Sequence, residues 1–442
     1  MKQLIVLGNG FDLACGLKSS YNDFFLDRFN KLFGDDNLPK PATIEDEDFQ
    51  NKLSEKRDTI WVNTGQLSNP RIPLKQTQGY KTTRPDYFKK LSKNWTNDKQ
   101  TLTRWDVIFL FAELCLDKKV SAYKWQDIES IILEVISIAL DFQNKYSLKL
   151  NYASTVNISL SSIPGEQLFK ELIYNISFTR EPSIEKTAAE LLNELEKFES
   201  AFANFITTQY KLDPFSNYIS NAKNLLRCLS RYHEFPFKQD APSEVDVLSF
   251  NYSLDKRFLD ILNDTRIETW SNIHGIASFA APNVRNNSQG NSEHVGDGII
   301  PAPIFGVDNH NIDDNDDWRI IFTKPYRVIE NGVNEIRKSN GYANTDKITI
   351  YGHSLGQADY SYFETIFDEN NLYNSNTEIE YFYYAGEDPL EKVKNRKNAT
   401  KTLYNLLTDY GKTLSDRHGN NIINKLNIEN RLTIASTENL PS

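Results

Sequence analysis

The sequence predicts an α/β protein whose mostly parallel sheet is interrupted by a large helical insertion. Short apolar runs at residues 4–7, 245–250 and 347–351 each end in glycine or polar residues, which is typical of buried parallel strands. Between the first and second runs, apolar residues instead recur at helical spacing. Later in the chain, apolar runs alternate with helical segments, which favours a parallel sheet covered by helices.

The first expected strand runs directly into a glycine turn and then a helix. The residues of this turn and of the helix start are Gly8, Asn9, Gly10, Phe11 and Asp12. Because glycine has no side chain, a bound phosphate could approach the backbone N–H groups there, and the helix would point its positive end at it. Leu13 stands where a dinucleotide fingerprint has its third glycine, so a tight turn without a ligand is the alternative.

Composition limits the classes of function. The 442 residues are enough for two domains or for one domain with a substantial insertion. The net charge of −10 argues against a general nucleic-acid-binding surface. Three cysteines, Cys15, Cys115 and Cys228, without CxxC spacing predict neither a disulfide framework nor a structural zinc site.

Targeting and metal-binding signals are missing from the sequence pattern. The N-terminus starts a core strand without a basic flank, a long apolar segment or a small-residue cleavage site, so we expect a cytoplasmic protein with no membrane partner. The acidic clusters at residues 45–48 and 313–317 lack a metal-binding spacing and are expected to be solvated loops. We therefore predict no metal.

The middle of the chain is expected to be helical. Helical spacing covers residues 104–116, 125–142, 184–210 and 215–232, and it is clearest at 184–210. The predicted organisation is a first part of an α/β nucleotide-binding core with a polar surface excursion at 1–100, a helical insertion at 101–240, and a second part of the core with a C-terminal tail at 241–442. The insertion could cover the active site or form a dimer, and periodicity does not choose between these.

Further strands are expected after residue 240. They are residues 245–250, the region of 273–275, residues 304–308, 347–351 and 379–384. Ligands bind at the carboxyl ends of strands in open parallel sheets. The polar residues that follow these strands are therefore candidates for a site.

The N-terminal stretch GNGFDLACGLKSSYNDFF resembles the opening of the AbiH family, bacterial abortive-infection proteins that act in defence against phage. The segment Trp125-Gln126-Asp127-Ile128-Glu129 is similar to a tryptophan–acid motif of that family. The resemblance implies an antiphage effector that responds to a phage-derived trigger. It leaves open whether the protein forms a homo-oligomer.

Four short motifs, in the same order along the chain, also resemble sirtuins. They are the glycines Gly8, Gly10 and Gly16, then Phe250-Asn251-Tyr252-Ser253, then Ile273-His274-Gly275, and finally Gly352-His353-Ser354-Leu355. The resemblance implies a sirtuin-like, Rossmann-like sheet with NAD as substrate or ligand. Asp12 replaces a sirtuin serine, Ser253 replaces an aspartate that contacts nicotinamide, and the four-cysteine zinc module is absent, so protein deacylation is not expected.

The remaining chemistry is cleavage of the nicotinamide–ribose bond, which would yield nicotinamide and ADP-ribose. Asn251 would orient the ribose with its amide, and His274 would accept a proton from water or a ribose hydroxyl. The predicted ligand contacts are Gly8, Asn9, Gly10, Phe11, Asp12, Gly275, Gly352, His353, Ser354 and Leu355. The alternative is that Asn251 caps a turn and His274 satisfies buried backbone groups.

Two other functions stay open. Gly352-His353-Ser354-Leu355-Gly356 is a G-x-S-x-G motif between a strand and a helix, which is the setting of a serine-hydrolase nucleophile elbow, and His418 is the only histidine after it. That hypothesis leaves the N-terminal glycine turn unexplained. A non-catalytic nucleotide-binding sensor is the third possibility.

Overall fold

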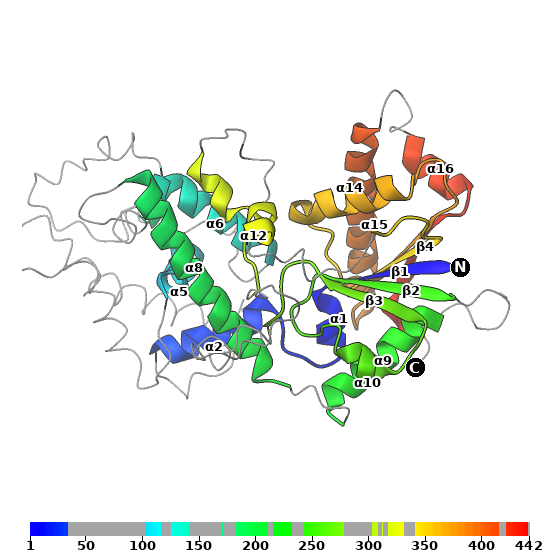
Figure 1. Ribbon diagram of the computed structural model, residues 1–442, viewed down its shortest axis with the longest axis horizontal. Helices are drawn as coiled ribbons and strands as arrows, with labels where there is room; N and C mark the ends of the chain where they lie inside the picture. Colours follow the sequence, from blue (N-terminus) through cyan, green and yellow to red (C-terminus); the bar gives the residue numbers. More distant parts are fainter. Residues whose placement is uncertain are drawn as a thin grey trace, which may run out of the picture. The chain divides into compact units, whose positions relative to one another are not determined.

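The chain divides into two compact units. The sheet unit comprises Met1–Ser20, Glu199–Ile304 and Lys324–Ser442, and the helical unit comprises Tyr21–Phe198 and Phe305–Thr323 (Figure 1). The computed structural model describes residues 1–33, 103–115, 125–140, 169–170, 173, 183–210, 215–231, 242–277, 303–307, 312, 317–330, 341–414 and 421–440. The acidic clusters at residues 45–48 and 313–316 lie outside these ranges, as does His418.

All strands of the six-stranded sheet are parallel to their neighbours. The strands are β1 (Lys2–Leu7), β2 (Glu244–Ser249), β3 (Ile267–Asn272), β4 (Lys347–Tyr351), β5 (Glu378–Tyr383) and β6 (Leu432–Ser436), in the order β3-β2-β1-β4-β5-β6. Leu7 lies opposite both Ser249 and Tyr351, so these strands end level with one another. The predicted α/β fold with a parallel sheet is confirmed.

Helices cover both faces of the sheet (Figure 1). Helices α14 (Tyr360–Glu369), α15 (Pro389–Thr413) and α16 (Ile422–Ile428) share one apolar core with the sheet. Its members include Leu4, Val6, Ile348, Ile350, Phe363, Phe367, Leu403, Leu407 and Leu426. Helix α9 (Asn217–Arg231) contacts β1, where Gln3 donates a side-chain hydrogen bond to the carbonyl of Leu229 at 3.2 Å. The shorter helices of this unit are α1 (Asn9–Ala14), α10 (Phe258–Leu262) and α12 (Lys324–Glu330).

The sequence pattern was wrong or silent at two places. The strand expected at residues 304–308 is not part of the sheet, since Val307 makes only an isolated bridge with Thr323. The segment described as a tail contains α15, α16 and the edge strand β6. In α15 the buried residues are diluted by lysine and asparagine, so its apolar stripe is weak in the sequence.

Of the four helices expected from periodicity, α9 belongs to the sheet unit and the other three lie wholly or mostly in the helical unit. Helix α2 (Tyr21–Phe33) is followed by α5 (Arg104–Cys115), α6 (Trp125–Leu140), α8 (Ile184–Thr207), which extends into the sheet unit, and the 3-10 helix η6 (Trp318–Phe322). Aromatic rings from three of these helices meet, with centroid distances of 5.3 Å for Phe24–Phe198 and 5.1 Å for Phe109–Phe198. Asp127 and Glu129 of the tryptophan–acid motif lie near the start of α6, where acidic residues are expected from the helix macrodipole.

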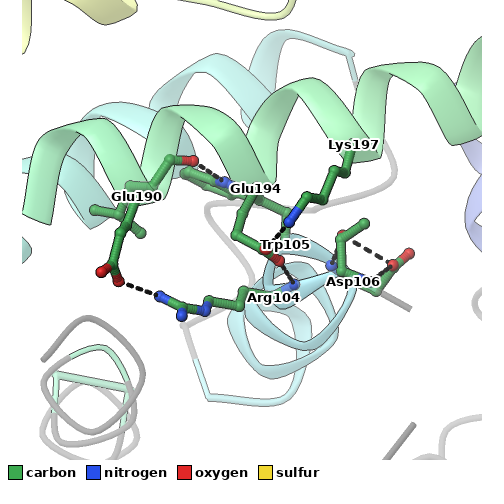
Figure 2. Close-up of polar contacts among 8 residues, drawn as sticks. Arg104, Trp105, Asp106, Glu190, Glu194 and Lys197 are labelled. Carbon is green, nitrogen blue, oxygen red and sulfur yellow. Dashed lines mark hydrogen bonds and ion pairs between the residues drawn. The ribbon is translucent and has the colours of Figure 1, made fainter. Parts of the chain in front are cut away.

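The first turn of α5 is fixed to α8 by polar contacts (Figure 2). The indole of the buried Trp105 donates to the carbonyl of Leu191 at 3.0 Å. The backbone N–H of Arg104 donates to Glu194 at 3.0 Å, and its guanidinium pairs with Glu190 at 3.2 Å. An indole that is buried needs such an acceptor, so these bonds favour one docking of α5 on α8.

The same turn of α5 contains a buried ion pair. Asp106 accepts from the backbone N–H of Thr103 at 2.7 Å, as in a capping box. Both of its oxygens also accept from Arg28 of α2, each at 2.6 Å. Every one of these charges has a partner, and the ion pair links α2 to α5.

Candidate functional site

Polar and glycine turns follow strands β1, β2, β3 and β4 and meet at one edge of the sheet. The chain order runs outward from β1 to β3, and then returns to the other side of β1 at β4. This reversal places the turn after β1 beside the turn after β4. Ligands of open parallel sheets bind at such a switch point.

The two glycine turns at the switch point pack backbone against backbone. The N–H of Gly8 donates to the carbonyl of Tyr351 at 2.9 Å, and that of Gly10 donates to the carbonyl of Gly352 at 2.8 Å. A Cβ at Gly8 would lie 2.4 Å from the Cα of His353, and one at Gly10 would lie 2.6 Å from the Cα of Gly352. Glycine is required here for the contact between the turns, and both N–H groups are engaged within the protein.

Gly10→Ala is expected to lower the free energy of unfolding by about 2–3 kcal/mol or more, since two backbones would have to separate. Gly16→Ala is the matched control. Gly16 has a positive φ of 91° but nothing within 4 Å of its added Cβ, so its cost should be only about 1–2 kcal/mol. The thermal midpoints of the two variants measure the difference. A Gly10→Ala protein as stable as Gly16→Ala would contradict the close packing.

Asn9 and Phe11, the neighbours of Gly10 in the first turn, differ in their exposure to solvent. Asn9 is exposed, and its side-chain oxygen accepts from Ser19 at 2.5 Å. Phe11 is buried, with its ring edge-on to Tyr351 at 6.2 Å. Asn9 is therefore the residue of this turn that is open to solvent.

Asn251 follows β2 and joins it to the first glycine turn. Its side-chain amide donates to the carbonyl of Gly8 at 2.9 Å, and its own carbonyl accepts from Asn272 at 2.9 Å. The residue is buried. The side chain of Asn251 therefore stabilises the first glycine turn through its hydrogen bond to Gly8, a structural role close to the turn-capping alternative.

Asp12 lies buried in α1 among hydroxyl groups. Ser253 donates to its Oδ2 at 2.6 Å, and Tyr218 of α9 donates to its Oδ1 at 2.7 Å. Burial raises the pKa of Asp12 from 3.8 to about 6, although hydrogen bonds from Ser253, Tyr218 and Asn251 oppose this. The two positions that depart from the sirtuin motifs, Asp12 and Ser253, are therefore bonded to each other.

His353 is a neutral residue with both ring nitrogens in use. Its Nδ1 accepts from the N–H of Leu355 at 2.9 Å, so the ring hydrogen is on Nε2, which faces Asp359 at 3.5 Å. Burial lowers the pKa of His353 to about 4, against the effect of Asp359. Asp359 also accepts from Lys324 at 3.1 Å. This histidine fixes the turn after β4 and is poorly suited to accept a proton.

His274 follows β3 and is buried beside the same group of residues. Its ring lies edge-on to Phe250 at 5.6 Å and to Tyr362 at 5.5 Å. Phe250 also contacts His353, at 4.3 Å. Gly275, the next residue, has a positive φ of 89° and lets the chain turn away from the strand.

Ser354 does not have the setting of a nucleophile elbow. It is exposed, and the positive φ values of this turn belong to Gly352 and Leu355, at 67° and 51°. Leu355 itself is buried in the apolar core. Neither nitrogen of His353 is bonded to the Ser354 hydroxyl, since Nδ1 faces the N–H of Leu355 and Nε2 faces Asp359. His418, the histidine that the hydrolase hypothesis requires, lies outside the described residues, so its position relative to Ser354 stays untested.

Sequence reasoning missed three residues of this edge. Tyr218, Lys324 and Asp359 come from α9, α12 and the 3-10 helix η7 (Gln357–Asp359). Only Asp359 had a local signal, because it follows the GHSLG motif by three residues. No group of three or more His, Cys, Asp or Glu side chains in the described ranges is placed to hold a metal ion.

Six parallel strands in this order, with glycine turns at the switch point, define a Rossmann-like α/β protein. The chain belongs to the bacteriophage abortive infection AbiH family, whose family model matches residues 4–383. Its role is accordingly in antiphage abortive infection.

Comparisons with curated proteins and with solved structures identify no further relative. No curated protein and no solved structure matches the chain. The similarity to sirtuins therefore rests on the short motifs alone and stays a prediction. Among the described helices, none combines the length and the apolar character needed to cross a membrane.

Proposed function

We propose that the protein acts against phage by binding NAD, or a related nucleotide, at the carboxyl edge of its sheet and hydrolysing NAD to nicotinamide and ADP-ribose. The observation that carries the proposal is the strand order β3-β2-β1-β4-β5-β6, which is the order of dinucleotide-binding sheets. Both glycine turns of the sequence motifs follow the two strands that flank the switch point. A shared fold alone does not define a function, so the proposed reaction depends on the side chains at this edge of the sheet.

Asn251 and His274 are the proposed catalytic residues. They follow neighbouring parallel strands, β2 and β3, and Asn272 donates to the carbonyl of Asn251 at 2.9 Å between them. In the proposed reaction the bond between ribose C1′ and the nicotinamide nitrogen breaks, and its electron pair neutralises the pyridinium charge. The oxygen of water bonds to C1′, while His274 accepts the proton of that water and Asn251 orients the ribose.

The structure changes what we assign to the first glycine turn. The N–H groups of Gly8 and Gly10 already donate to carbonyls after β4, and α1 has only six residues. We therefore do not place the diphosphate on these two N–H groups. The exposed Asn9 is the proposed contact of this turn with the nucleotide.

A nucleotide sensor without turnover is the second candidate. It is favoured by burial, since Asn251 is 5% and His274 is 4% exposed. Covered side chains fit a protein that binds a ligand without turning it over. For the enzyme, we propose instead that a phage-derived trigger uncovers Asn251 and His274.

The test measures NAD binding by calorimetry and nicotinamide release by chromatography, with and without phage lysate. The proposal predicts nicotinamide and ADP-ribose in equal amounts, with more turnover when lysate is present. Binding without turnover in both conditions would support the sensor. Protein that neither binds nor depletes NAD would end both proposals.

A further inference from the structure

Helix α15 presents a row of lysines to solvent. Lys394, Lys397 and Lys401 are all exposed, and their spacings of three and four residues place them on one face of the helix. Tyr404, three residues further on, continues the row. The opposite face of the helix, which includes Leu403, is packed in the apolar core. We call Lys394, Lys397, Lys401 and Tyr404 the basic stripe.

The charges of the basic stripe are not neutralised by nearby acids. Residues 392–401 contain five cations and no acid, in a chain whose net charge is −10. Among the residues that the structure describes, none accepts a hydrogen bond from, or forms an ion pair with, the ammonium groups of the stripe. Lys392 of the same helix, in contrast, pairs with Glu438 at 2.7 Å. Like charges three and four residues apart repel, so the stripe lowers helix stability and needs another explanation.

The phosphates of a nucleic acid strand fit the charge and the length of the basic stripe. At about 1.5 Å per residue, Lys394 and Lys401 lie about 10 Å apart along the helix. That distance is the rise of about three nucleotides of one strand. The net charge of the chain argues against a general nucleic-acid-binding surface, whereas the stripe is confined to one helix face.

Tyr404 favours a single strand over a duplex. Its side chain is 56% exposed and lies about one turn beyond Lys401 on the same face. Bases of a single strand are free to stack on an aromatic ring, which is how many proteins hold single strands beside a row of positive charges. Asn398 and Asn405 are also exposed on this side of the helix, and their amides can donate to and accept from bases.

An anionic membrane fits the basic stripe less well. A helix that lies on a membrane inserts its apolar face among the lipids, and the apolar face of α15 is packed in the core of the sheet unit. The exposed aliphatic residues of α15 are Leu390 and Val393, which is little area for insertion. An acidic protein surface would pair with the lysines but would leave Tyr404 without a base to stack on.

We propose that the basic stripe of α15 binds the phosphate backbone of a single-stranded nucleic acid, with Tyr404 stacked on one of its bases. This interaction goes beyond the proposed action on NAD. It can be measured without NAD, so its outcome is separate from that of the proposed function.

The test measures binding of fluorescent oligo(dT) and oligo(U), each about 20 nucleotides long, to the full-length protein by anisotropy, at salt concentrations from about 50 to 200 mM. The triple variant Lys394→Gln/Lys397→Gln/Lys401→Gln should bind at least about tenfold more weakly at the lowest salt. The slope of log affinity against log salt should fall in magnitude by about 2, because each lost phosphate contact removes about 0.7. Its thermal midpoint should equal or exceed that of wild type, since like-charge repulsion is removed.

The matched control removes the same charge from outside the stripe. Lys186, Lys256 and Lys425 are exposed or partly exposed and lie on other elements of the chain. The triple variant Lys186→Gln/Lys256→Gln/Lys425→Gln should bind the strands nearly as wild type does. Equal loss of binding in the two triple variants would mean that net charge alone attracts the strand, and the proposal would be wrong.

Tyr404 provides a second, uncharged comparison. Tyr404→Ala should weaken binding by about tenfold, whereas Tyr404→Phe keeps the ring and should bind nearly as wild type does. Tighter binding to a duplex of the same length, or no binding to either strand, would overturn the proposal. Binding to vesicles that contain phosphatidylserine, without binding to either strand, would instead assign the stripe to a membrane surface.

Discussion

Replacing His274 with alanine is expected to lower kcat for NAD hydrolysis by at least about 100-fold, because a positioned general base contributes roughly 10²–10⁴-fold. The residue is buried against Phe250 and Tyr362, so truncation also leaves a cavity. His274→Gln keeps much of the volume and should be equally inactive. Circular dichroism and thermal midpoints identify any loss of folding.

Ser354→Ala is the comparison that separates the two enzyme hypotheses. Under the NAD-cleavage hypothesis Ser354 would only donate a hydrogen bond to the ligand, worth about 1 kcal/mol to a neutral acceptor, or roughly fivefold in affinity. A nucleophile would lose several orders of magnitude in rate. Ser354→Ala protein that is inactive toward an ester substrate, beside fully active His274→Ala, would reverse our assignment.

Asn251→Ala should also abolish turnover, but its interpretation needs a correction for stability. The side chain donates to the carbonyl of Gly8 at 2.9 Å, and its removal leaves that buried acceptor without this bond. We expect a stability cost of about 1–3 kcal/mol. Activity is therefore compared at a temperature where both proteins are folded.

The second large effect is expected for Asp12→Asn, which should raise the free energy of unfolding at pH 7.5 by up to about 3 kcal/mol. Burial raises the pKa of Asp12 from 3.8 to about 6, so the folded chain binds this proton more tightly than the unfolded chain does. The stability contributed by the group is fully present below about pH 4 and is lost as pH rises through about 6. Asparagine is uncharged and avoids this loss.

Urea unfolding of the full-length protein at pH 4 and pH 7.5 measures the effect. The advantage of Asp12→Asn over wild type should be small at pH 4 and large at pH 7.5. Ser253→Ala has the opposite sign at pH 7.5, because it removes a hydrogen bond of 2.6 Å to the ionised carboxylate. Equal pH dependence in wild type and Asp12→Asn would contradict the raised pKa.

A carboxylate that costs stability at neutral pH is a candidate for function, since such groups cluster at active sites. Asp12 is held by two hydroxyl groups beside the switch point. We expect Asp12→Asn to be more stable and less active in NAD cleavage. A variant that gains both stability and activity would assign Asp12 no part in the site.

The sequence by itself determined most of the strands, the two glycine turns and most of the helices, but it missed the edge strand β6 and wrongly placed a strand at residues 304–308. The run Leu4–Leu7 is apolar on both faces, which is typical of a buried parallel strand, and Ile348 and Ile350 give β4 one apolar face. The apolar stripe of α8 was equally clear in the sequence. These signals are local, because each depends on residues within a few positions of one another.

Only the tertiary structure decided which groups meet. Asn251 bonds to Gly8 across 243 positions, and Asp12 bonds to Ser253 across 241, so no local pattern could pair them. Lys324 and Asp359 lie next to each other because α12 and the turn after β4 are brought together by folding. The sheet order also places the turn after β4 against Gly8 and Gly10. Their N–H groups donate to the carbonyls of Tyr351 and Gly352, whereas the local turn alone would leave these N–H groups free to bind a phosphate.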